Sequence, residues 1–501
     1  MVYGTALAEA AAQTGDRKMG RLSDLEPKAV WKYFEEICGI PHGSGNEKAI
    51  SDYCVAFAGE RGLKVWQDEA WNVVIVKEAV SGYEDQEPLI LQGHLDMVCE
   101  KKPDCEIDFE KDGLCPVVDG DFVCAEGTTL GGDDGIAVAY ALAALADEEL
   151  RHPRLEVIFT TSEEVGMDGA AALDVSMLRG HTLLNMDSEE EGILLAGCAG
   201  GCSAGIHLPL EREKRSGIHA VLTLQGLTGG HSGAEIHKGR GNANRLLSAL
   251  LEELREQAEY RLISVEGGQK DNAIPRSCRA ELMFDDKASW QKAEVYCREA
   301  EERLRKTYAG TDRELRLIFV KEGKKEAETF TEASFAHAMA LLNRLPNGVL
   351  QMSGDIEGLV QTSLNLGIVR TEEQELVLRY SIRSSVSAEK EALVEQIRQS
   401  VRQEGGIMKT NGDYPAWEYR KDSPFRDDCV RIYRELFGTE PKVEAIHAGL
   451  ECGLLASKIP DLDAISMGPQ MYGIHTTEEK LCIASVERMW RYIRKIIERR
   501  S

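Results

Sequence analysis

Runs of apolar residues separated by polar turns predict a series of buried strands and helices. The run at residues 157–160 is β-branched or aromatic, which is typical of a buried strand. Further strand-like runs occupy residues 88–93, 182–184 and 463–468. Apolar positions at helical spacing predict an amphipathic helix at residues 27–40, and an alanine-rich helix is expected at residues 136–146. We expect an α/β fold in which these strands form one mostly parallel central sheet flanked by helices.

The pattern changes at about residue 197. From there to residue 404 the chain reads as helices alternating with pairs of strands, in two successive rounds. The first round covers residues 219–320 and the second covers residues 335–404. The rounds differ in sequence, but their common order of elements predicts an internally duplicated α+β unit.

Acidic and imidazole side chains follow the predicted strands of the central sheet or lie in a nearby turn. These side chains are His94, Asp96, Asp133, Glu163, Glu164, Asp187 and His475. Open α/β sheets place their chemistry at the carboxyl ends of strands, so we expect this set at one edge of the sheet. Imidazoles combined with carboxylates are the ligands of sites that hold two metal ions.

The pair Glu163 and Glu164 has a simpler explanation, because acidic residues also complement the dipole at the start of a helix. Taken alone, the pair does not distinguish the two interpretations. The repetition of acids and histidines at several strand ends favours the metal site.

Composition narrows the class of protein. The formal net charge of −26 argues against nucleic acid and anionic membranes as partners. The 13 cysteines form no Cys-x-x-Cys pair, which argues against a disulfide framework or zinc ribbon and favours a reducing cytoplasm. No apolar run is long enough to span a bilayer, and residues 1–19 are interpreted as an N-terminal extension rather than a signal peptide.

The candidate ligands also divide the chain into domains. Residues 197–404 contain none of these candidate site residues, so we interpret them as an inserted second domain. His475 must return to the same site as the other ligands. Residues 20–196 and 405–501 are therefore predicted to form one catalytic, metal-binding domain.

Several motifs resemble those of the co-catalytic zinc metallopeptidases, a superfamily that includes carboxypeptidase G, the aminoacylases, tripeptidase T and dipeptidase D. They surround His94-Leu95-Asp96, Asp133-Asp134, Glu163-Glu164, Asp187 and His475, in the order of that superfamily. The insertion at residues 197–404 stands where that superfamily carries its lid domain, so the resemblance implies an inserted lid domain. The segment at residues 446–453, Ile-His-Ala-Gly-Leu-Glu-Cys-Gly, resembles the aminoacyl-histidine dipeptidase branch. The resemblance implies a cytoplasmic dipeptidase that prefers Xaa-His substrates, including β-alanyl-histidine. It also implies a homodimer, unless the duplicated lid replaces that of a partner.

The resemblance implies a role for each metal-site residue. Asp133 bridges two divalent ions, most suitably Zn²⁺, with Mn²⁺ or Co²⁺ as substitutes. His94 and Asp187 complete one ion, and Glu164 and His475 complete the other. Asp96 orients His94, and Glu163 is the general base that activates water. The resemblance also implies a cis peptide bond between Asp133 and Asp134.

Four residues are candidates for contact with the substrate, and three of them lie in the lid. His231 matches the histidine that stabilises the oxyanion, although a histidine between glycines also serves to cap a turn. Arg383, Asn365 and Gly449 are candidates for binding the substrate carboxylate, although the first two are equally compatible with polar strand positions.

Two other functions use the same motifs. One is the hydrolysis of N-acyl amino acids or amides on the same scaffold. The other is a catalytically silent protein that binds metal or peptide, but such a protein has no need for Glu163 beside the ligand Glu164.

Overall fold

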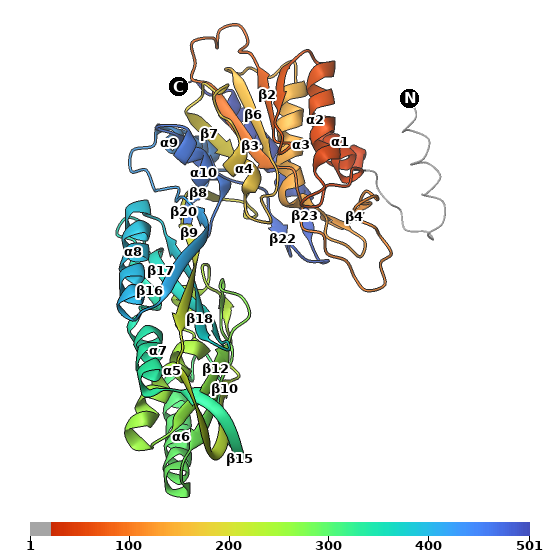
Figure 1. The fold of residues 1–501 in the computed structure, drawn as a ribbon. Helices are drawn as coiled ribbons and strands as arrows, with labels where there is room; N and C mark the ends of the chain where they lie inside the picture. Colours follow the sequence, from red (N-terminus) through yellow and green to blue (C-terminus); the bar gives the residue numbers. More distant parts are fainter. Residues whose placement is uncertain (1–21, 501) are drawn as a thin grey trace. The chain divides into compact units, whose positions relative to one another are not determined.

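The computed structural model describes residues 22–500, so the predicted extension at residues 1–19 lies outside the described residues. The described chain forms two compact units (Figure 1). Unit 1 comprises the residues up to Leu194, Ser423–Lys442 and the residues from Asp461 onward, and unit 2 comprises Leu195–Asp422 and Val443–Pro460. None of the helices in the described part of the chain is long and apolar enough to cross a membrane.

Unit 1 contains the predicted central sheet. Six of its eight strands lie wholly in this unit. In spatial order they are β1 (Lys64–Gln67), β2 (Val73–Lys77), β6 (Leu155–Thr160), β3 (Leu89–His94), β7 (Thr182–Asn185) and β21 (Asp463–Ser466). The four strands from β6 to β21 pair in parallel, whereas β1 and β2 pair antiparallel at the edge. Every residue of β3, β6 and β7 is buried, which explains their continuous apolar runs. The predicted α/β fold class is confirmed.

Helices cover this sheet. They are α1 (Lys28–Cys38), α2 (Lys48–Glu60), α3 (Gly132–Ala146), α9 (Pro424–Phe437) and α11 (Ile483–Ile497). The alanine-rich α3 is buried along almost its whole length, because it packs against both β3 and α1. Tyr140 of α3 also stacks on Trp490 of α11, with ring centroids 6.1 Å apart. The small side chains of α3 allow this close packing, which fixes the start of the helix beside the end of β3.

A smaller sheet in unit 1 carries His475, the last candidate ligand along the chain. Its strands, in order, are β22 (Met471–Tyr472), β23 (Lys480–Cys482), β5 (Phe122–Ala125) and β4 (Pro116–Asp119). His475 lies in the loop that joins β22 to β23. The sequence placed His475 after a strand of the central sheet, whereas the structure places it in a hairpin loop of this second sheet.

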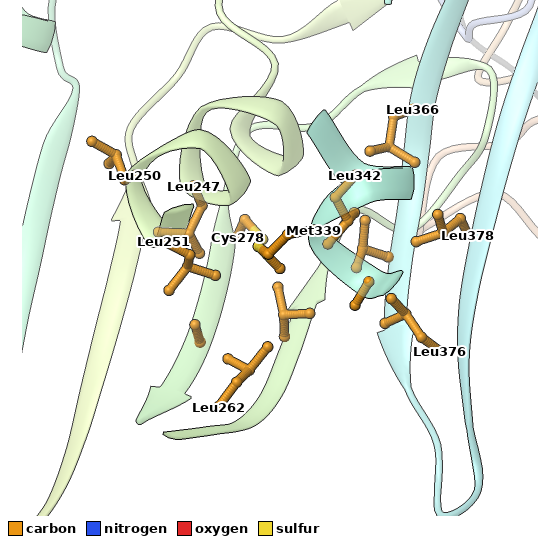
Figure 2. Packing of buried hydrophobic residues seen from close by; sticks show 14 of the residues in the cluster. Leu247, Leu250, Leu251, Leu262, Cys278, Met339, Leu342, Leu366, Leu376 and Leu378 are labelled. Atoms are coloured by element: carbon orange, nitrogen blue, oxygen red, sulfur yellow. The ribbon is translucent and has the colours of Figure 1, made fainter. Parts of the chain in front are cut away.

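Unit 2 is built on a nine-stranded sheet with helices along one face (Figure 1). The helices are α5 (Ala243–Gln257), α6 (Lys287–Thr307), α7 (Glu332–Arg344) and α8 (Ser387–Gln403). Figure 2 shows the core between helices and sheet, where Leu247 of α5 and Met339 of α7 face buried strand residues such as Leu376. One continuous core therefore joins both predicted rounds of the repeat.

The strand order of unit 2 supports the predicted duplication. One half of the sheet runs β15 (Arg316–Phe330), β10 (Arg212–Gln225), β14 (Cys278–Phe284) and β12 (Arg261–Gly267). The other half runs β17 (Val360–Thr371), β18 (Glu375–Ser384), β9 (Gly200–Pro209) and β19 (Ile407–Tyr414). Numbered within each half along the chain, the strands lie in the order 4-1-3-2 and then 2-3-1-4. The two halves mirror each other, and β12 pairs with β17 to join them.

The duplication also corrects the predicted domain boundary. The sequence assigned residues 405–501 to the catalytic domain, but β19 pairs antiparallel with β9 and completes the second half of the repeat. Unit 2 therefore extends to Asp422, and it also includes Val443–Pro460. The segment at residues 446–453 consequently belongs to unit 2 and not to the unit that holds the candidate ligands.

Candidate metal centre

Asp133 lies in the first turn of α3, where the backbone is not yet helical, beside the end of β3. Its Oδ1 lies 3.1 Å from Nε2 of His94, and its Oδ2 lies 3.1 Å from Nε2 of His475. Each carboxylate oxygen thus faces a different imidazole, which is the geometry that a bridging ligand requires. The peptide bond between Asp133 and Asp134 is cis, as predicted.

The first half of the centre is deeply buried. His94 ends β3, and its Nε2 lies 3.7 Å from Oδ1 of Asp187, which follows β7. Burial and the nearby Asp134 carboxylate raise the pKa of Asp187 well above its usual value. A divalent cation here would offset both effects, because it stabilises the charged form of each carboxylate.

The second half is more open to solvent. Glu164 follows β6, and its Oε1 lies 2.8 Å from Nε2 of His475. Hydrogen bonds with Asp133 and Glu164 raise the pKa of His475 to about 10. In the metal-free protein this imidazole is therefore protonated at neutral pH and occupies the place of a cation between the two carboxylates.

These donors fit divalent metal ions. Two overlapping groups each bring three donor atoms within 4.8 Å of one another, namely His94 with Asp133 and Glu164, and His94 with Asp134 and Asp187. Asp134 was not a predicted ligand, and its Oδ2 accepts a hydrogen bond from the backbone N–H of His94 at 3.1 Å. Asp133 suits the bridging position better, since its oxygens face both imidazoles.

Glu163 and Glu164 lie in a turn and not in a helix. The next helix, α4 (Asp168–Ala172), begins after them, so the alternative that they complement a helix dipole fails. Asp96 holds this turn, because Oδ1 accepts the N–H of Glu163 at 3.0 Å and Oδ2 accepts the N–H of Glu164 at 3.2 Å. Burial is the main cause of the raised pKa of Asp187, and repulsion from the Glu163 carboxylate adds to it.

Asp96 therefore does more than the sequence predicted. His94 Nδ1 lies 2.9 Å from the backbone oxygen of Asp96 and 3.5 Å from its Oδ1. The same residue orients the imidazole and supports both glutamates. Glu47, which the sequence did not single out, accepts the N–H of Ser162 at 3.1 Å and fixes the start of the turn.

Replacement of Asp96 by Asn tests this role. The NH₂ group of the new asparagine would face the backbone N–H of Glu163 or Glu164, where an oxygen now accepts a hydrogen bond. The backbone at these two residues should therefore shift. Loss of such supporting contacts costs about 10–100-fold in metal affinity or activity, which metal titration and steady-state kinetics would measure. Ser44→Ala is the control, because Ser44 donates only one hydrogen bond to Asp96, at 2.8 Å. Equal effects of both substitutions would contradict the special role of Asp96.

The predicted lid residues lie in unit 2. His231, in β11 (Gly230–His231), accepts the N–H of Gly233 at 3.2 Å and that of Ala234 at 3.1 Å through Nδ1. The imidazole thus caps a turn, as the alternative interpretation expected. Because Nδ1 accepts these two hydrogen bonds, the proton of the neutral ring lies on Nε2. Burial and the positive charge of Arg383 lower the pKa of His231, so the ring is neutral with one N–H to donate.

Arg383 and Asn365 have different surroundings. A Cβ atom at Gly233 would lie 3.0 Å from the His231 ring and 3.2 Å from Nε of Arg383, so these two side chains approach the same point. Arg383 donates to the hydroxyl of Tyr414 at 2.7 Å. The amide group of Asn365 instead donates to the carbonyls of Asp271 and Ala273, at 2.9 and 2.8 Å. Asn365 therefore supports the strand that pairs with His231, and this conformation does not offer its amide to a substrate.

Another residue missed by the sequence, His447, lies next to this group. It is buried, and its Nε2 lies 2.7 Å from Oγ of Ser363. Burial and Arg383 lower its pKa to about 3, so the ring stays neutral. Gly449, the remaining predicted residue, lies two positions further on, between β20 (Lys442–Ile446) and α10 (Glu451–Lys458).

Comparisons with known proteins extend over nearly the whole chain. The model of peptidase family M20/M25/M40 matches residues 90–499. The cytosol non-specific dipeptidase of Escherichia coli (strain K12) is 39% identical over 483 residues, which are 96% of this chain and 99% of that protein. The crystal structure of the aminoacylhistidine dipeptidase from Vibrio alginolyticus has a TM-score of 0.90 and 36% identity, covering 96% of this chain and 98% of that one. The crystal structure of aminopeptidase PepT from Bacillus cereus has a TM-score of 0.54 at 14% identity over 95% of this chain and 98% of that one, a likeness of fold alone.

Proposed function

Because the chain belongs to peptidase family M20/M25/M40, we propose that it is a dipeptidase whose centre holds two divalent metal ions. The observation that supports this most is the orientation of Asp133, which directs one oxygen to His94 and the other to His475. Zn²⁺ suits a set of imidazoles and carboxylates, and Mn²⁺ and Co²⁺ are chemically acceptable substitutes.

Glu163 is the proposed general base. When bound, the two ions supply Lewis acidity that activates a water and polarises the scissile carbonyl. Glu163 accepts the proton of the attacking water and then delivers it to the nitrogen of the leaving amine. Its neighbour Glu164 points to His475, so the pair divides proton transfer from metal binding.

Residues of unit 2 offer the groups that a dipeptide needs. His231 has one N–H at Nε2, which suits the oxygen of a carbonyl that takes on negative charge. Arg383 has a guanidinium that suits the carboxylate at the end of the substrate. We assign these two roles to His231 and Arg383, and Gly449 remains a candidate for a backbone contact.

The proposed substrates are unblocked dipeptides with histidine in second position, including β-alanyl-histidine. Support comes from the Vibrio alginolyticus relative, which is named for aminoacylhistidine substrates, and from the segment at residues 446–453. The Escherichia coli relative is named a non-specific dipeptidase, so a broader range of dipeptides belongs to the same proposal. The alternative is an N-acyl amino acid or amide hydrolase on the same scaffold.

A substrate panel distinguishes these functions. We expect the Zn²⁺-loaded protein to give its highest kcat/KM with Xaa-His dipeptides and much lower values with peptides of four or more residues. Matched pairs such as glycyl-histidine and N-acetyl-histidine isolate the free amino group as the one difference. Preference for the acetylated member would favour the acylase, and equal rates on long peptides would contradict a dipeptidase.

The location and assembly of the protein are also proposals. No disulfide bond joins the cysteines in the part of the chain that the structure describes, which suits a reducing compartment. The Escherichia coli relative is named a cytosol enzyme, and we infer the same compartment for this chain. The predicted homodimer stays a prediction, which sedimentation of the purified protein would check.

A further inference from the structure

Glu479 is a buried carboxylate that the proposed mechanism does not use. It lies at the end of the loop that carries His475, and only 4% of its surface is exposed. Its Oε2 accepts the N–H groups of Leu130 and Gly131 at 2.7 and 3.2 Å. Its Oε1 accepts those of Gly132 and Asp133 at 2.8 and 3.4 Å. One side chain therefore holds four consecutive N–H groups of the turn that presents Asp133.

These contacts join two loops that are distant in sequence. The turn carries Asp133 and the loop carries His475, and the two side chains meet at 3.1 Å between Oδ2 and Nε2. His475 has a φ of 60°, a left-handed conformation that residues with side chains rarely adopt. Its loop is closed by Thr476, which donates to the carbonyl of Gly473 at 2.6 Å and accepts the N–H of Glu479 at 3.2 Å. Both the backbone and the carboxylate of Glu479 therefore constrain how His475 meets Asp133.

We propose that Glu479 is a positioning residue for the metal centre, which sets the distance between Asp133 and His475 so that the ion between them is bound tightly. This inference rests on the proposed two-ion site. The competing explanation is that Glu479 only satisfies the unpaired N–H groups where α3 begins. In that case its loss would lower stability but leave metal affinity unchanged.

Glu479→Gln separates the two explanations. The substitution replaces one oxygen by an NH₂ group, which would face backbone donors and displace the turn. Supporting contacts of this kind are worth about 10–100-fold in metal affinity. We expect the affinity for the second Zn²⁺, the ion assigned to Glu164 and His475, to fall by that factor. The ion assigned to His94 and Asp187 should be retained.

The adjacent residue provides a matched control. Glu478 has a side chain that is 75% exposed and pairs with Lys102 at 2.8 Å. Glu478→Gln removes the same charge from the same loop without touching the turn at residues 130–133. We expect this variant to bind both ions as the wild type does.

The experiment titrates metal-free, full-length protein with Zn²⁺ against a chelating dye, and follows unfolding of each protein by circular dichroism. A weakened second site in Glu479→Gln, with an unchanged Glu478→Gln, supports the proposal. Wild-type affinity for both ions in Glu479→Gln overturns it, even if the melting temperature falls.

A second variant guards against misfolding. If Glu479→Gln does not fold, Glu479→Asp replaces it, because the shorter carboxylate cannot reach all four N–H groups. Wild-type affinity in Glu479→Asp then overturns the proposal, and a weakened second site supports it. If the wild-type protein itself binds fewer than two Zn²⁺ in this titration, the proposed two-ion centre is wrong. That result is distinct from a failure of the proposal for Glu479.

Discussion

Glu163→Gln is expected to lower kcat by about 10²–10⁴-fold while the protein keeps its metal content, because this factor is typical for the loss of a general acid–base. Glutamine has nearly the shape of glutamate but cannot accept a proton from water. The Asp96 carboxylate would still hold the turn through the N–H groups of residues 163 and 164. Elemental analysis of the variant measures its metal content, and steady-state kinetics measure its kcat.

Glu164→Gln is the comparison that gives this result its meaning. Glu164 faces His475, so its loss should reduce metal content as well as turnover. Both variants replace a glutamate by a glutamine, at adjacent positions, so the chemical change is the same. If Glu163→Gln retained wild-type turnover, or lost metal as Glu164→Gln does, Glu163 would not be the base.

Removal of metal should abolish activity and lower the melting temperature. A ligand that binds only the folded state stabilises it by about 2.7 kcal/mol when its concentration is 100 times Kd. Without cations, burial and neighbouring carboxylates disfavour the charged form of Asp187. Calorimetry before and after chelation measures the loss, and Zn²⁺ added back should restore both properties. Activity that survives proven metal removal would contradict a metal-dependent enzyme.

The stability of the metal-free protein should depend on pH through His475. The folded-state pKa of His475 is raised from 6.5 to about 10 by Asp133 and Glu164. A raised pKa stabilises the fold fully below the unfolded value, and the contribution is lost as pH rises through the folded value. The gain in melting temperature on adding Zn²⁺ should therefore grow between pH 6.5 and 10. His475→Gln should remove this trend, and a gain that stays constant would contradict the pairing.

The central sheet and most of the cluster of candidate metal ligands could be predicted from local sequence alone. Buried parallel strands need continuous apolar runs, so β3, β6, β7 and β21 were visible in the pattern. Because such strands point the same way, residues that follow them meet at one edge of the sheet. His94, Glu164 and Asp187 were therefore brought together correctly without any knowledge of their distances.

Long-range strand pairing was not visible in the same way. From the sequence we ended the duplicated unit at residue 404 and so left out its last strand, β19. This strand pairs with β9, which lies about 200 residues earlier in the chain. The first half of the repeat is inserted between β9 and α7, so the two ends of the second half are far apart in the chain. Hydrogen bonds between strands leave no trace in the composition of either strand, and only the folded sheet reveals them.

The sequence by itself determined which side chains can bind metal, since imidazole and carboxylate chemistry belongs to the residues and not to the fold. The tertiary structure decided how they are held. Asp133 and His475 are separated by 342 positions, and they meet because the loop of one sheet lies against the first turn of α3. The carboxylate of Glu479 holds the turn that carries Asp133, and those of Glu47 and Asp96 hold the turn that carries Glu163 and Glu164, each by accepting backbone N–H groups. Every residue except proline has such a group, so no pattern of side chains could have predicted these contacts.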